Sequence, residues 1–143
     1  MLSAAKHLLM VLAPVAVLHA QGDTTITIKA FSSTLEFVPA SITLKAGTRL
    51  RLRFQNEGTY PHNFVLPKND DDIDDLAAAA INAGESGFVP VAMKDKLIAW
   101  TGLVSAGEVG EITIVVPPPG KYTYVCLFPG HPASMLGILR SLK

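Results

Sequence analysis

The segment Tyr124-Val125-Cys126-Leu127-Phe128-Pro129-Gly130-His131-Pro132-Ala133-Ser134-Met135 decides how this 143-residue chain is interpreted. It continues an alternating stretch, Lys121 to Cys126, in which two tyrosines and the cysteine fall on one side, as in a strand with one buried face. Pro129 and Gly130 then predict a tight loop, because proline fixes φ and glycine accepts unusual dihedral angles. A strand that enters such a loop can direct a thiol, an imidazole and a thioether toward one centre.

Working outward, most of the chain from Gln21 onward alternates with period two, which predicts strands. In residues 49–54 three arginines alternate with apolar side chains, so one face is expected to be solvated and the other buried. Prolines 117–119 and Gly120 predict a turn. Several short strands separated by turns predict an all-β sandwich. The expected strands cover residues 25–29, 42–46, 50–54, 62–66, 111–116, 121–126 and 136–142.

One segment, residues 70–84, departs from this pattern. Five aspartates in residues 70–75 precede an alanine-rich run, and Gly84 follows. Aspartates favour the start of a helix, alanine favours its interior and glycine favours its end. We expect one short helix inserted in the β domain. The acidic run is interpreted either as a solvated helix start or as a docking site for a basic redox partner.

The first twenty residues resemble a secretory signal peptide. Lys6 precedes the apolar run from Leu8 to Leu18, and Ala20 offers a small residue for cleavage. The run is shorter than the about 20 residues that a membrane span needs. We therefore expect a signal peptide at 1–20, a single domain at 21–143 without a stable membrane span, and a periplasmic or otherwise exported bacterial protein. An uncleaved membrane anchor is the alternative.

Removing this leader leaves few side chains that are able to bind a metal ion. Two histidines remain, His62 and His131, together with the single cysteine, Cys126, and the methionines Met93 and Met135. A lone thiol cannot form an internal disulfide, so in an exported protein it is either a buried core residue or a metal ligand. Eleven basic and twelve acidic side chains remain, which gives no reason to expect nucleic-acid binding.

The remaining donors match one kind of metal centre. Two imidazoles and a thiolate in a plane, with a long axial thioether, form a blue-copper electron-transfer site. We therefore predict one type 1 copper ion bound by His62, Cys126, His131 and Met135. Met93 is expected to be a packing residue.

The residues around these donors resemble those of the azurins and auracyanins. The similarity includes residues 124–135, the segment Pro61-His62-Asn63-Phe64-Val65-Leu66, the insertion at 70–84 and the stretch from Phe37 to Gly47. It implies a Greek-key cupredoxin sandwich that acts as a soluble one-electron carrier. It also implies that Asn63 ties the two ligand loops together, and that the amides of Asn63 and Phe128 donate to the sulfur.

The chain departs from that family at two positions near the site. Pro61 stands where azurins have a glycine whose carbonyl makes a weak axial contact, and Pro132 replaces a small polar residue. Azurins also carry a disulfide, which a single cysteine cannot form.

Electron exchange requires a docking surface. Apolar residues around His131 are expected to form a patch for transient redox partners. They are Pro61, Phe128, Pro129, Pro132 and Ala133.

The same residues also fit other classes of function. Cys126 and His131 fit the nucleophile and base of a thiol hydrolase, although no third orienting group is recognisable. A copper-handling protein without a role in a redox chain uses the same donors, and zinc binds Cys and His in tetrahedral sites.

Overall fold

The computed structural model describes residues 23–31 and 34–143. The expected signal peptide at 1–20 lies outside these residues. Within the part of the chain that is described, no helix has the length and apolar character needed to cross a membrane.

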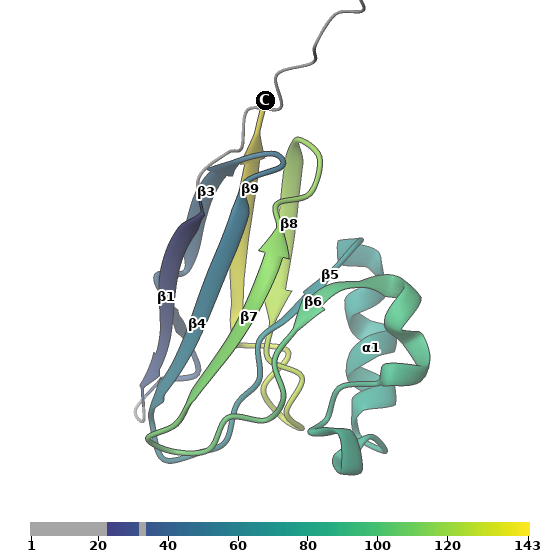
Figure 1. The fold of residues 1–143 in the computed structure, drawn as a ribbon. Coiled ribbons are helices and arrows are strands. Elements are labelled where there is room, and N and C mark those ends of the chain that lie inside the picture. The colour runs from purple at the N-terminus through teal and green to yellow at the C-terminus, as the bar shows by residue number, and fades with distance from the viewer. Residues whose placement is uncertain (1–22, 32–33) are drawn as a thin grey trace, which may run out of the picture.

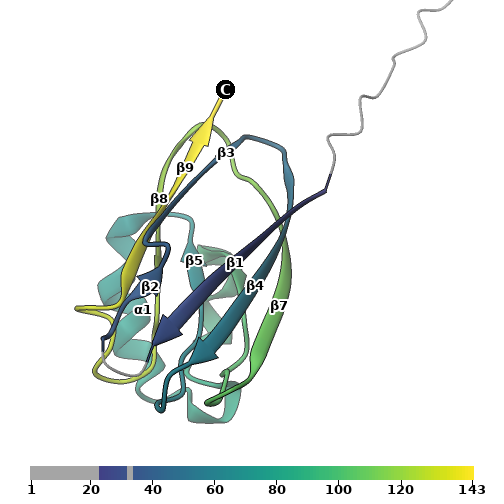
Figure 2. The ribbon, with the colours of Figure 1, turned by 90° about the vertical axis from the view of Figure 1, so that its left-hand side faces the viewer.

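Nine strands in the described residues form two sheets that pack face to face (Figures 1 and 2). One sheet has the order β2-β1-β4-β7 and the other the order β3-β9-β8-β5-β6. The pairs β1–β4 and β3–β9 are parallel and the remaining pairs are antiparallel. This arrangement confirms the predicted β-sandwich. The strands are β1 Thr24–Phe31, β2 Phe37–Val38, β3 Ser41–Lys45, β4 Arg49–Glu57, β5 Val65–Pro67, β6 Leu97–Trp100, β7 Val109–Val115, β8 Gly120–Val125 and β9 Leu136–Leu142.

Strand β4 shows how the alternating pattern produces the two faces of the sandwich. Leu50, Leu52 and Phe54 are fully buried between the sheets, and the arginines between them face outward. Arg51 and Arg53 pair with Glu111 on the neighbouring strand β7, at N–O distances of 3.5 and 2.8 Å. The single carboxylate of the adjacent strand therefore offsets part of the positive charge on this face.

Aromatic rings fill the centre of the sandwich. Phe37 makes edge-to-face contacts with Phe54, Phe64 and Tyr124, with ring centroids 5.7, 6.0 and 5.1 Å apart. Tyr124 lies on β8 directly opposite Gly137 of β9, and a Cβ atom at residue 137 would overlap the tyrosine ring. Only glycine fits there, so the Tyr124 ring can cover β9 two residues before Cys126.

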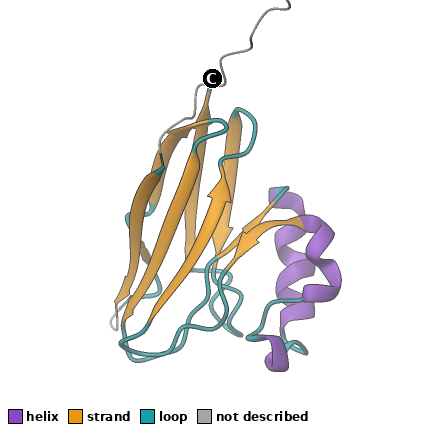
Figure 3. Ribbon diagram, viewed as in Figure 1, coloured by secondary structure: helices purple, strands orange, loops and turns teal. Residues whose placement is uncertain are grey.

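The helical segments lie together between β5 and β6, on one side of the sandwich (Figure 3). They are η1 Asp70–Asp72, α1 Ile73–Ala80, η2 Gly84–Ser86 and η3 Val91–Lys96. Helix α1 buries Leu76 and Ala80 in a second apolar cluster that also contains Val125 and Leu127. The single helix expected at 70–84 is therefore shorter than predicted. It ends at Ala80, and Gly84 begins η2 instead of terminating the helix.

The acidic run has a structural role that the sequence did not indicate. Asp70 accepts hydrogen bonds from the backbone amide and the hydroxyl of Thr123 on β8, at 3.0 and 2.8 Å. Asp72 pairs with Lys96 at 2.7 Å. Asp74 and Asp75 lie in the first turn of α1, as expected for a helix start, whereas Asp72 occupies the N-cap position without making a side-chain capping hydrogen bond. The carboxylates of Asp70 and Asp72 instead connect the insertion to β8 and to η3.

Candidate metal centre

The predicted donors lie where two connections meet at one end of the sandwich. Cys126 directly follows β8, and the loop from β8 to β9 carries His131 and Met135. His62 lies on the connection from β4 to β5. Both connections are at the lower end of the view in Figure 1, beside the helical insertion.

Backbone hydrogen bonds fix the shape of the β8–β9 loop. The amide of His131 donates to the carbonyl of Phe128 at 2.9 Å, and the amide of Met135 donates to the carbonyl of His131 at 2.9 Å. The amide of Cys126 donates to the carbonyl of Met135 at 3.1 Å, which closes the loop at its base. Gly130 has φ 86°, a left-handed conformation that glycine adopts without strain. The predicted role of Gly130 in the turn is thus confirmed.

His62 is held by a bridge to Val104 and not by a long strand. Its amide donates to the Val104 carbonyl at 3.1 Å, and its carbonyl accepts from the Val104 amide at 2.8 Å. Strand β5 begins only at Val65, so the expected strand at 62–66 is displaced toward its C-terminal end. Thr101 completes the attachment, because its hydroxyl accepts a hydrogen bond from the Phe64 amide at 3.0 Å.

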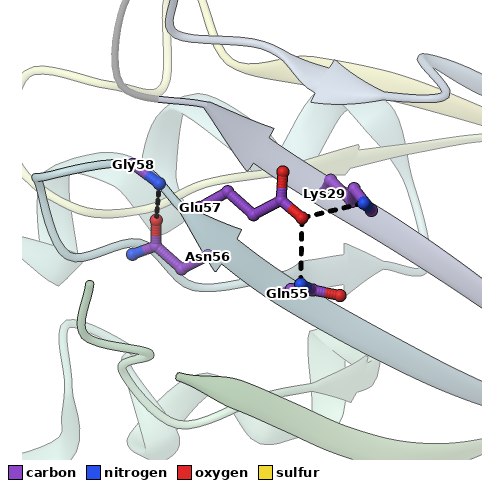
Figure 4. Close-up of polar contacts among 5 residues, drawn as sticks. All are labelled: Lys29, Gln55, Asn56, Glu57 and Gly58. Atoms are coloured by element: carbon purple, nitrogen blue, oxygen red, sulfur yellow. Dashed lines mark hydrogen bonds and ion pairs between the residues drawn. The ribbon is translucent and has the colours of Figure 1, made fainter. Parts of the chain in front are cut away.

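Asn56 organises the turn that leads to His62. Its side-chain oxygen accepts from the amide of Gly58 at 2.9 Å, a contact drawn in Figure 4. Its side-chain nitrogen donates to the carbonyls of Tyr60 and Val104 at 2.8 and 2.9 Å. Sequence analysis missed this residue. The signal was present, since Asn56 occupies the next inward position after Phe54 in the alternation of β4 and is fully buried.

The three strongest donor atoms converge. The Nδ1 atoms of His62 and His131 are 3.2 Å apart, and they lie 3.8 and 3.6 Å from the Sγ atom of Cys126. All three residues are buried, and His131, at 8 % exposure, retains the most contact with solvent. Two connections from distant parts of the chain therefore bring a thiol and two imidazoles to one point.

Met135 belongs to the same part of the core. Its side chain is fully buried in the apolar cluster that contains Cys126. Its backbone contacts both neighbouring donors through the loop hydrogen bonds described above. Met93, by contrast, packs against the second cluster beneath α1, as expected for a packing residue.

Burial sets the protonation of the donors. It raises the pKa of the Cys126 thiol to about 11, and the backbone amides of Asn63 and Phe128 act in the opposite direction by donating to the sulfur. Burial and the proximity of His131 lower the pKa of His62 to about 4, and burial also lowers the pKa of His131. At neutral pH the two imidazoles are uncharged and the thiol is protonated, so a metal ion must displace the thiol proton.

Asn63 joins the two ligand connections, as the resemblance to the azurins and auracyanins implied. Its side-chain oxygen accepts from the amide of Leu127 at 2.7 Å, and its side-chain nitrogen donates to the carbonyl of Gly87 at 2.9 Å. The residue is fully buried. The contact to Gly87 adds the helical insertion to the network, and only the Ser-Gly turn signal at 86–87 hinted at this segment in the sequence.

The spacing of the donor atoms fits a first-row metal ion. A point equidistant from the three atoms lies about 2.1 Å from each, which matches metal–nitrogen and metal–sulfur bonds of about 2.0–2.3 Å in protein sites. Thiolate and imidazole donors with a nearby thioether select copper over harder cations. The residues present therefore fit the copper ion that the sequence implied.

Comparison with known proteins points to the same class. Residues 24–140 match the copper-binding proteins of the plastocyanin/azurin family. Auracyanin-B of Chloroflexus aurantiacus is 39 % identical over 110 residues, which are 75 % of this chain and 47 % of that protein, so the chain spans about half the length of this relative. The copper-resistant cuproprotein CopI of Rubrivivax gelatinosus is 33 % identical over 121 residues, which cover 82 % of this chain and 66 % of that protein.

Solved structures share the fold as well as the sequence. Auracyanin A, a blue copper protein from the green thermophilic photosynthetic bacterium Chloroflexus aurantiacus, superimposes with a TM-score of 0.81 at 32 % identity. The alignment covers 85 % of this chain and all of that one. The extent of the family match, the shared sandwich and the buried thiol–imidazole cluster lead to one assignment: the chain belongs to the plastocyanin/azurin family of blue copper proteins.

Proposed function

We propose that the protein is a one-electron carrier with a single type 1 copper ion, in which His62, Cys126 and His131 are the planar ligands and Met135 is the axial ligand. The observation that carries this proposal is the burial of one thiol and two imidazoles around a common point. Bound copper supplies a reversible one-electron change. The protein supplies donors whose positions are fixed by hydrogen bonds before the metal arrives, which limits rearrangement between the two oxidation states.

The surroundings of the sulfur favour a carrier over a thiol hydrolase. A nucleophilic cysteine must be reachable by its substrate. Cys126 is fully buried beneath the loop that carries His131. The amides of Asn63 and Phe128 that point at the sulfur are suited to stabilising a thiolate bound to metal and to adjusting its reduction potential.

Voltammetry of the copper-loaded protein tests the redox role. We expect one reversible wave corresponding to one electron per chain, and rapid electron self-exchange between the oxidised and reduced forms. An irreversible wave, or loss of copper on reduction, would contradict a carrier.

We further propose that electrons leave through the apolar surface beside His131. Pro129, Pro132 and Ala133 line a groove of about 360 Å³ together with residues of α1. Ile81 at the end of that helix is 64 % exposed. An apolar surface next to the most exposed ligand suits brief encounters with small interfaces.

Self-exchange also tests this surface without requiring a known partner. Ala133→Glu places like charges against each other when two copies meet through the groove, so self-exchange should slow. Val115→Glu adds the same charge at an exposed position on β7, opposite Arg49 and at the end of the sandwich far from the metal centre. This variant should change the self-exchange rate little. Equal rates in the two variants would exclude the proposed surface.

A copper-handling role is the second candidate, because the cuproprotein from Rubrivivax gelatinosus is among the relatives. A handling protein must release its metal to an acceptor. We expect a carrier instead to retain its Cu(I) in the presence of a chelator over a time in which many self-exchange events occur. Fast transfer of Cu(I) to the chelator would favour copper handling.

The leader and the domain boundary remain proposals. We propose that residues 1–20 direct export, that the domain spans 21–143, and that the mature protein is periplasmic or otherwise exported. N-terminal sequencing of the protein recovered from its native cells tests this. A start at Gln21 supports cleavage, and an intact leader supports an anchor.

A further inference from the structure

A short turn in the helical insertion, residues 83–88, contacts both ligand connections of the metal centre. The amide of Phe88 donates to the carbonyl of Ala83 at 2.9 Å and closes the turn. Gly87 and Phe88 both have left-handed backbones, with φ 67° and 61°. A Cβ atom at residue 87 would lie 2.9 Å from the backbone nitrogen of Leu103, so glycine is needed there for space as well as for φ.

Phe88 is unusual because its backbone is left-handed although it is not a glycine. It is the one non-glycine residue with positive φ in the described part of the chain. A bulky L-residue adopts this conformation at an energetic cost and does so only when the surrounding structure enforces it. Unfavourable backbone geometry of this kind often accompanies a functional constraint. The contacts of the Phe88 ring are therefore informative.

The Phe88 ring reaches the loop between β8 and β9. It packs edge-to-face on Phe128, with centroids 5.0 Å apart and an interplanar angle of 73°. Phe128 in turn packs on the imidazole of His131, with centroids 4.8 Å apart. Phe88 is partly buried and packs against the cluster beneath α1, and Phe128 packs in the same way against the cluster between the sheets. The ring pair therefore connects the two cores at the edge of the metal centre.

The same turn also contacts the other ligand connection. The carbonyl of Gly87 accepts from Asn63, which follows His62 and binds the amide next to Cys126. The 83–88 turn is thus linked to His62 through Asn63, to Cys126 through Asn63 and Leu127, and to His131 through Phe128. The left-handed pair Gly87–Phe88 is what directs the carbonyl to one connection and the ring to the other.

We infer that Phe88 is a positioning residue of the metal centre, which holds the His131 imidazole through Phe128. This inference rests on the proposed ligand role of His131. His131 lies on a loop and is the most exposed of the three planar donors. Its ring has the greatest need of a second support beyond the loop hydrogen bonds.

Hydrogen exchange in the metal-free protein tests the inference directly. Phe88→Ala should accelerate exchange of the His131 amide, relative to core amides of β4, by about two- to tenfold, the factor that an edge-to-face aromatic pair supplies. Phe88→Tyr keeps the ring and should restore protection. Met93→Ala, which removes another side chain from the same cluster, should leave the ratio unchanged.

Phe88→Gly separates positioning from stability. It removes the ring and also the cost of the left-handed backbone, so its global stability should exceed that of Phe88→Ala. The His131 amide should nevertheless exchange as fast as in Phe88→Ala. If exchange at His131 follows global stability across the four variants, Phe88 is only a packing residue and the inference fails.

The copper-loaded proteins provide the second readout. Phe88→Ala and Phe88→Gly should share an altered copper hyperfine splitting and a shifted reduction potential, whereas Phe88→Tyr and Met93→Ala should match the wild type. Wild-type signals in all four would overturn the inference. A wild-type protein without a blue copper spectrum would instead count against the proposed function, and the metal-free exchange data would still decide the role of Phe88.

Discussion

Replacing Asn63 by alanine should destabilise the metal-free protein strongly, because one buried side chain joins three segments. The substitution removes the hydrogen bonds to the Leu127 amide and the Gly87 carbonyl, at 2.7 and 2.9 Å. It leaves the buried Leu127 amide and the partly buried Gly87 carbonyl without partners. Each unsatisfied group costs about 1–3 kcal/mol. We therefore expect a loss of about 3 kcal/mol in the free energy of unfolding.

The assay is thermal or urea unfolding of the metal-free protein at neutral pH. For a domain of this size, about 3 kcal/mol corresponds to a decrease of about 12 °C in Tm. Asn82→Ala is the matched control, because Asn82 is exposed at the end of α1. Its Tm should change by no more than about 2 °C, as surface substitutions usually change stability little.

The copper-loaded variant extends the same prediction. Asn63 links the β4–β5 connection, which carries His62, to the β8–β9 loop, which follows Cys126. Its loss should therefore also speed the release of copper. A loss of less than about 1 kcal/mol in the metal-free protein, a value typical of an ordinary exposed hydrogen bond, would refute the view that Asn63 holds the two connections together.

Three further outcomes follow from the structure. Gly137→Ala should lower the free energy of unfolding, measured in urea, by about 2–3 kcal/mol or more, because the new Cβ would overlap the buried Tyr124 ring. Gly102→Ala is the control, because a Cβ there has free space and should cost little. Equal losses in the two variants would contradict the packing argument. Binding of each Cu(II) at pH 7–8 should release about one proton into weak buffer, since the thiol of Cys126 is protonated and the imidazoles are not. No release, or release of two protons, would contradict these protonation states. The unfolded chain binds a proton at His62 below about pH 6.5, but the folded chain binds it only near pH 4. Because the unfolded state gains this proton first, the free energy of unfolding of the metal-free protein should fall by up to about 3 kcal/mol between pH 7 and pH 4. The difference between the wild-type and His62→Gln curves isolates this contribution, and parallel curves would refute it.

The sandwich was predictable because its strands obey simple local rules. Alternation in β4 and β8 identified the buried faces of those strands, and the turn predicted at 117–120 separated two strands. The donors were predictable for another reason: few thiols and imidazoles are available in the chain. Chemistry and spacing then left little choice of partners.

What the sequence did not reveal are the contacts that depend on tertiary placement. Asp70 has the sequence context of a helix start, and its contact with Thr123 appears only in the structure. The alternation of β4 directs Asn56 inward, but it does not identify Val104 as the partner of this side chain. The left-handed Phe88 has no local signature, because phenylalanine seldom adopts positive φ. The contacts of such residues are known only when segments distant in sequence are brought together.

The most direct test of the central claim is the visible and electron paramagnetic resonance spectrum of the metal-free protein after addition of one equivalent of Cu(II). The account predicts an intense orange-red absorption band and the narrow copper hyperfine splitting of a thiolate-bound type 1 site, both lost in Cys126→Ser. A pale spectrum with wide splitting, unchanged by that substitution, would contradict the assignment of Cys126 as a copper ligand.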